Sequence, residues 1–163
     1  MKPNQEIRIL TVDDNIENLQ VLGSLLHQMD YQVAIAQSGN EALRMLPRVY
    51  PDLILLDIMM PGMDGYQTLE KIKQMHEWKA VPVIFLSAKH SPEDIVKGFE
   101  LGAVDYITKP FNKSELTVRI RTHLQLRFTQ RDLEDSQKQL QENIRLKDKL
   151  FSIISHDLRS PIS

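Results

Sequence analysis

Acidic side chains follow two apolar segments of this 163-residue chain, and a hydroxyl and an ammonium group follow two others. Asp13 and Asp14 come after the first segment, Asp57 after the third, Ser87 after the fourth and Lys109 after the fifth. If these segments are parallel strands of an open sheet, their carboxyl ends meet at one edge, where such sheets bind ligands. We therefore expect the five side chains to share one cleft.

Three carboxylates in one cleft repel one another. Two like charges about 4 Å apart cost ~4 kcal/mol at an effective dielectric constant of 20, so one carboxylate would otherwise take up a proton. A Mg²⁺ ion suits a site of few carboxylates that keeps several waters. Lys109 and Ser87 add a positive charge and a hydroxyl donor, which suit the oxygens of a phosphoryl group transferred to Asp57. Singly, each residue has an ordinary explanation as a helix cap or loop residue, but their common position favours a site.

Short apolar runs alternate with amphipathic segments up to residue 111. The strand-like runs are Ile7–Val12, Gln32–Ala36, Leu53–Leu56, Val81–Leu86 and Val104–Ile107. The helical segments are Asn15–Met29, a segment from Glu41 that Ser38 caps, Gly65–His76, and a segment from Ser91 to Gly102. This alternation predicts an α/β fold with a five-stranded parallel, doubly wound (flavodoxin-like) sheet in the order 2-1-3-4-5.

Five short motifs resemble the receiver domain of two-component response regulators. They are Val12–Asn15, Leu56–Asp57, Met60–Gly65, Leu86–Ala88 and Tyr106–Phe111. The match covers residues 6–124, which we interpret as one receiver domain. The resemblance implies two-component phosphorelay signalling, in which a histidine kinase or a phosphotransfer protein donates the phosphoryl group.

The resemblance also implies roles for the acidic residues. Asp57 is the expected phosphoacceptor and a metal ligand. Asp14 is expected to bind Mg²⁺ directly and Asp13 mainly through water. The backbone carbonyl of Met59 is expected to complete the protein ligands of the ion.

Further roles concern the response to phosphate. The resemblance implies that the Ser87 hydroxyl moves toward the phosphoryl group and that Tyr106 fills the space it leaves. Lys109 is expected to pair with phosphoryl oxygens, and the peptide bond before Pro110 is expected to be cis. None of these positions departs from the family pattern, so we expect a competent site.

The C-terminal third is predicted to form one helix. Residues 113–160 contain no glycine or proline, and Asn112 with Glu115 can cap the start. Apolar residues recur at two sets of heptad positions: Leu126, Leu133, Leu140 and Ile154, and Ile144, Phe151 and Leu158. Lys147 interrupts the first set, and Gln130 and Gln137 occupy the second. We predict a coiled coil over residues 125–150 and a homodimer through residues 113–160; the alternative is a solvated helix attached to one domain.

His156 lies in the segment Phe151–Pro161, which is similar to the H-box of sensor histidine kinases. Asp157 is placed to orient the imidazole and accept its proton, and Pro161 to kink the helix. We interpret residues 151–163 as the start of the dimerisation and phosphotransfer domain, with His156 as its phosphoacceptor. The chain is then a fragment of a hybrid kinase. Because its ATP-binding motifs are absent here, we expect no autophosphorylation from ATP.

The composition argues against several other classes. There is no cysteine, which excludes disulfides and thiolate metal sites and fits a reducing cytoplasm. No apolar run approaches the ~20 residues that span a bilayer, and the N-terminus lacks a signal peptide pattern. The basic excess of residues 113–163 is small and interleaved with acids, so we expect no binding to nucleic acid.

These observations favour a Mg²⁺-dependent receiver that is phosphorylated on Asp57 and regulates a C-terminal histidine kinase through a dimeric helix. Whether the chain counts as an enzyme stays open, since it promotes phosphoryl transfer only to itself. One alternative is a phosphatase of the haloacid dehalogenase type, but such enzymes have Asp-x-Asp after the strand, and Met59 stands at the second position here. The other alternative is a dimeric scaffold that never receives phosphate.

Overall fold

Five parallel strands form one sheet within residues 6–88 and 91–159, the part of the chain that the computed structural model describes. The strands are β1 (Arg8–Val12), β2 (Gln32–Ala36), β3 (Leu53–Asp57), β4 (Val83–Ser87) and β5 (Asp105–Thr108), in the order β2-β1-β3-β4-β5. The predicted fold class and strand order are confirmed. Strand β4 begins two residues later than predicted, because the Val81 N–H bonds to the Trp78 carbonyl in a turn and Pro82 has no N–H to donate.

Polar caps begin the helices that connect the strands. These helices are α1 (Ile16–His27), α2 (Gly39–Val49), α3 (Gly65–Gln74) and α4 (Pro92–Leu101), and their N-caps are Asn15, Ser38, Asp64 and Ser91. The predicted cap at Ser38 is confirmed, since its Oγ accepts the Glu41 N–H at 3.1 Å. The Glu41 carboxylate accepts from the Gln37 N–H rather than from Ser38. At the other end of α4, Gly102 adopts the left-handed conformation, with φ of 109°.

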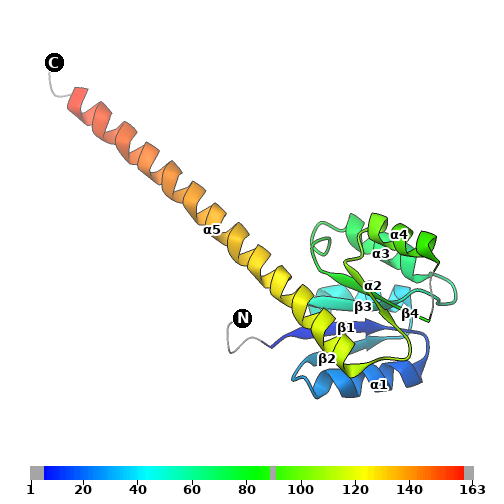
Figure 1. The fold of residues 1–163 in the computed structure, drawn as a ribbon. Coiled ribbons are helices and arrows are strands. Elements are labelled where there is room, and N and C mark those ends of the chain that lie inside the picture. Colours follow the sequence, from blue (N-terminus) through cyan, green and yellow to red (C-terminus); the bar gives the residue numbers. More distant parts are fainter. Residues whose placement is uncertain (1–5, 89–90, 160–163) are drawn as a thin grey trace. The chain divides into compact units, whose positions relative to one another are not determined.

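Helices cover both faces of the sheet (Figure 1). Helix α2 contacts α3, and α3 contacts α4, so these three form one layer. Helix α1 and the start of α5 (Lys113–Arg159) lie together, because Lys113 bonds to Gln28 and Thr117 contacts Met29 at the end of α1. Every residue of β3 and β4 is buried, as expected for central strands of a sheet covered on both faces. Asp57 and Ser87 are the last residues of these two strands, at the same edge of the sheet.

Helix α5 is continuous, as predicted, and its residues divide between two compact units, Met1–Arg127 and Phe128–Ser163. In the first unit, Leu116, Ile120 and Leu124 are its buried residues, at four-residue spacing. Two residues of the predicted H-box, Ser160 and Pro161, lie outside the described residues. Across the described ranges, no helix combines the length and the apolar character needed to cross a membrane.

Candidate functional site

Three carboxylates meet at the carboxyl edge of the sheet. Asp13 and Asp14 follow β1, and Asp57 is the last residue of β3, the neighbouring strand. One carboxylate oxygen from each lies within 4.8 Å of the others. Asp13 and Asp57 are buried and Asp14 is exposed, so the cluster opens to solvent on one side.

These carboxylates line a cleft of about 260 Å³. Six of the eight site residues predicted from the sequence line this cleft. The two that do not are Tyr106 and His156. The lining residues are Asp13, Asp14, Asn15, Asn18, Asp57, Met59, Ser87, Ala88 and Lys109. Met59 is 80% exposed, and a ligand role for its carbonyl stays a prediction.

Asp13 is fixed by three donors. Its Oδ1 accepts from the Asn15 N–H at 2.9 Å, and its Oδ2 accepts from the Asn18 amide at 3.1 Å and from Lys109 Nζ at 2.9 Å. Asn18 was not predicted from the sequence. Its position, within the first turn of a helix that Asn15 caps, was the available indication that it would face the same cleft as Asp13.

Lys109 lies between two carboxylates. Its Nζ is 2.9 Å from Asp13 Oδ2 and 3.1 Å from Asp57 Oδ1. Its backbone N–H donates to the Ser87 carbonyl at 2.7 Å, and its bond to Pro110 is cis, as the resemblance implied. Burial lowers the pKa of Lys109, but the hydrogen bond to Asp13 and the charge of Asp57 outweigh this and raise it. The ammonium therefore stays charged.

One lysine does not neutralise this cluster. Burial, followed by the charge of Asp13, raises the pKa of Asp57 from 3.8 to about 6, against the opposing effect of Lys109. The site thus carries more negative charge than its own residues compensate. Oxygens that share one Mg²⁺ lie within about 4.2 Å of each other, twice its ligand distance. Three carboxylates at the observed separations fit such an ion with small movements.

Tyr106 lies outside the lining of the cleft. Its hydroxyl is 3.1 Å from the carbonyl oxygens of Asp94 and Ile95 in α4, and its ring packs against Phe85 and Phe99. Burial, first among the causes, raises its pKa to about 12. The predicted site residues therefore divide into a group at the cleft and an aromatic residue that contacts α4.

Gly98 is the position on α4 that admits this tyrosine. A Cβ at residue 98 would overlap the hydroxyl of Tyr106 and press on its ring. Gly98 was not predicted from the sequence, because a glycine within a helical pattern gives no indication of what packs against it.

His156 lies in the C-terminal unit and is 81% exposed. Its Nδ1 is 3.7 Å from Asp157 Oδ1, which is an ion-pair distance rather than a hydrogen bond. The two side chains therefore form no hydrogen bond, and the orienting role of Asp157 stays a prediction. The imidazole of His156 is accessible to solvent.

Comparisons with known proteins identify a receiver domain. The model of the response regulator receiver domain family matches residues 9–121. A probable cyclic di-GMP phosphodiesterase of Vibrio cholerae serotype O1 is 44% identical over 125 residues, which cover 77% of this chain. This chain spans 28% of the length of that relative.

Two solved structures are similar as well. A putative response regulator from Chloroflexus aurantiacus is 34% identical, with a TM-score of 0.70 over 74% of this chain and 98% of that one. The signal receiver domain of a signal transduction histidine kinase from Syntrophus aciditrophicus is 36% identical, with a TM-score of 0.67 over 72% of this chain and 89% of that one.

Proposed function

The chain belongs to the response regulator receiver domain family, and we propose that it accepts a phosphoryl group on Asp57 in a Mg²⁺-dependent reaction. The observation that carries the proposal is the single cleft in which Asp57 lies beside Asp13, Asp14, Ser87 and Lys109. A histidine kinase or a phosphotransfer protein is the proposed donor.

Asp57 is the nucleophile of the proposed reaction. One of its carboxylate oxygens attacks phosphorus in line, and the bond from phosphorus to the leaving group breaks with its electron pair going to that group. At neutral pH a carboxyl group with a pKa of about 6 is mostly ionised, so it needs no general base. Lys109 and Ser87 stabilise the phosphoryl oxygens by charge and by hydrogen bonding.

Asp13, Asp14 and Asp57 are the residues that would hold Mg²⁺, with the Met59 carbonyl as the proposed fourth group. When bound, the ion would supply positive charge near the phosphoryl oxygens. Asn18 and the Asn15 N–H keep Asp13 in position for this role, because they hold both of its oxygens.

We further propose that two copies of the chain pair through α5. The apolar residues at heptad positions are each more than half exposed on the single chain: Leu126, Leu133, Leu140, Ile144, Phe151, Ile154 and Leu158. Such a stripe gains stability when a second copy covers it. The similar receiver domain from a histidine kinase supports a parent protein in which residues 151–163 begin a kinase domain, with His156 as a phosphoacceptor and the receiver as its regulator.

Intact-mass measurement tests phosphorylation. The chain is incubated with acetyl phosphate, with and without Mg²⁺, beside Asp57→Asn, His156→Gln and the control Asp52→Asn. One phosphoryl adduct is expected in the wild type, His156→Gln and Asp52→Asn, only with Mg²⁺. Asp57→Asn should give none. No adduct under any condition would leave the scaffold as the better reading.

A further inference from the structure

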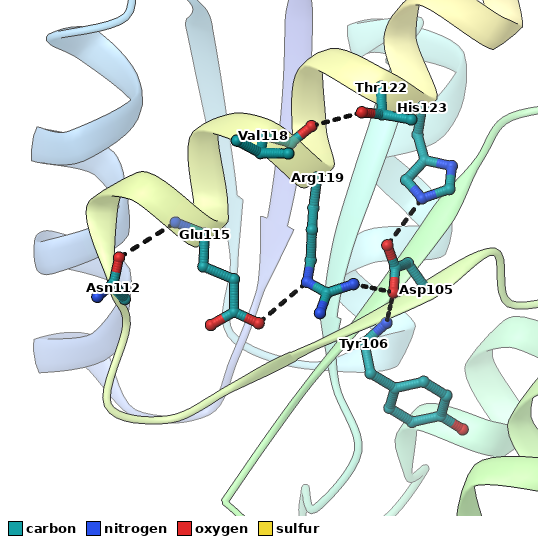
Figure 2. Close-up of polar contacts among 8 residues, drawn as sticks. All are labelled: Asp105, Tyr106, Asn112, Glu115, Val118, Arg119, Thr122 and His123. Atoms are coloured by element: carbon teal, nitrogen blue, oxygen red, sulfur yellow. Dashed lines mark hydrogen bonds and ion pairs between the residues drawn. The ribbon is translucent and has the colours of Figure 1, made fainter.

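One carboxylate joins the start of β5 to α5. Asp105 Oδ1 accepts from Arg119 Nη1 at 2.7 Å and from the Tyr106 N–H at 2.8 Å, and Asp105 Oδ2 lies 2.9 Å from His123 Nε2 (Figure 2). Arg119 and His123 are one turn apart on the same face of the helix. A single side chain therefore holds two successive turns of α5 and the backbone of Tyr106.

Asp105 and Tyr106 face opposite ways. Side chains of successive strand residues point to opposite faces of a sheet, and Figure 2 shows Asp105 directed toward α5 and the Tyr106 ring directed away from it. The ring and hydroxyl of Tyr106 contact α4. These two adjacent residues thus connect α4 to α5 through one peptide unit.

The contact between Asp105 and His123 is largely shielded from water, whereas Arg119 is 38% exposed and is held by a second carboxylate. The Asp105 side chain is 20% exposed and that of His123 is 15% exposed, so water replaces this contact poorly if it breaks. Arg119 is held from its other side by Glu115 at 3.0 Å, and the Glu115 N–H donates to Asn112 Oδ1 at the start of the helix. The first turns of α5 are therefore linked to one another as well as to Asp105.

We propose that Asp105 is a positioning residue that transmits a change at Tyr106 to α5. The proposal rests on the proposed function, since the family resemblance implies that Ser87 and Tyr106 move when Asp57 is phosphorylated. When the Tyr106 backbone shifts, the carboxylate that accepts its N–H shifts too, and Arg119 and His123 follow. Without Asp105, Tyr106 still contacts α4, but α5 loses this link to it.

The test separates loading of the cleft from the response of the helix. The 163-residue chain is loaded with Mg²⁺ and beryllium trifluoride, a mimic of a phosphoryl group on a carboxylate, and bound fluoride is observed by ¹⁹F NMR. Hydrogen exchange is then measured over residues 113–127. In the wild type we expect loading to change exchange over residues 119–127 by about fivefold, within the usual range of site-to-site coupling.

Two variants break the link and two serve as controls. Asp105→Asn and Arg119→Gln should bind beryllium trifluoride like the wild type yet lose most of the change in exchange. Glu115→Gln keeps the Asp105 contacts. Asp52→Asn alters another carboxylate that accepts a backbone N–H at the start of a strand, in this case the N–H of Arg8. Both controls should respond like the wild type. If Asp105→Asn folds poorly, Arg119→Gln decides the question from the helix side.

The outcomes distinguish failure of this inference from failure of the proposed function. An undiminished response in Asp105→Asn and Arg119→Gln overturns the role of Asp105 and leaves the proposed function intact. The same holds if the wild type binds beryllium trifluoride but hydrogen exchange in α5 stays unchanged. No bound fluoride in the wild type overturns the proposed function together with this inference. Loss of the response in both variants but in neither control supports the inference.

Discussion

Asp57 occupies a position that opposes its own ionisation. Burial and the charge of Asp13 both favour its protonated form, and Lys109 only partly offsets them. The residue proposed to receive phosphate is therefore also one whose charge destabilises the folded state when no metal ion is bound. Two predictions at the scale of single residues follow from this conflict.

The first concerns stability without Mg²⁺. Because folding raises the pKa of Asp57 from 3.8 to about 6, its contribution favours the fold below about pH 4 and is lost as the pH rises through 6. At pH 7.5, Asp57→Asn should therefore raise the free energy of unfolding by about 1–3 kcal/mol, since each pKa unit corresponds to about 1.4 kcal/mol. Urea unfolding at pH 4 and pH 7.5 measures this. An equal effect at both values would contradict the assigned cause.

The second concerns the metal ion. Mg²⁺ binds ionised Asp57, so its affinity should rise by about tenfold per unit as the pH increases toward 6 and level off above 7. Isothermal titration calorimetry from pH 5 to pH 8 measures the profile. Asp57→Asn should bind more weakly and lose this pH dependence; a profile unchanged by the substitution would show that another group titrates.

At the scale of elements, α4 and β5 meet where Gly98 leaves space for Tyr106. Glycine within a helix costs about 0.5–1 kcal/mol relative to alanine. In return, the Tyr106 hydroxyl reaches the carbonyl oxygens of α4. The helix propensity of glycine lowers the stability of the fold and the contacts of Tyr106 raise it. A pair of glycine substitutions separates these two contributions.

Gly98→Ala should destabilise the protein by about 1–2 kcal/mol, because displacing Tyr106 loses hydrogen bonds and packing that outweigh the gain in helix propensity. Gly23→Ala, in the middle of α1 with open space around it, should stabilise it by about 0.5–1 kcal/mol. Thermal unfolding of both variants, with the NMR signals of the Tyr106 ring, provides the measurement. Stabilisation by both would mean that Tyr106 moves away at little cost.

Local patterns predicted the elements well where the cause is local. The runs of apolar residues predicted the five strands, and the cap at Ser38 was read from its own neighbours. The capping box of Asp64 and Gln67 has the same kind of local basis and was overlooked. The start of β4 was misplaced because apolar character does not reveal that Pro82 lacks a donor for the strand.

Contacts between distant residues were predicted only where parallel strands bring their ends together. That rule placed Asp13, Asp57, Ser87 and Lys109 in one cleft. The rule on strand ends does not indicate which helix residue lies against Asp13, so Asn18 was not predicted. The contacts of Asp105 with Arg119 and His123 were missed for the same reason, since they depend on the angle at which α5 packs.

The exposed apolar stripe of α5 is left uncovered in a single chain. Leu140 lies on the stripe, whereas Leu146, also exposed, lies off the two heptad sets. In the proposed dimer, each copy of Leu140 contacts the partner chain and Leu146 does not.

Leu140→Ala should therefore weaken the dimer at least about tenfold, because two buried leucines are lost per dimer. Leu146→Ala removes the same atoms from the same helix and should leave the dissociation constant unchanged. Sedimentation equilibrium over a range of concentrations measures both. Equal weakening by the two variants would favour a different pairing face, and a monomer at all concentrations would favour the solvated helix.

The destabilising position of Asp57 also bears on how this sequence can change over generations. A mutation that removes the charge makes the metal-free fold more stable, so purifying selection for folding alone does not protect the residue. Only use of the site does. A lineage that ceases to exchange phosphate should lose Asp57 early, while Gly98 and the strand cores, whose loss harms the fold, persist much longer.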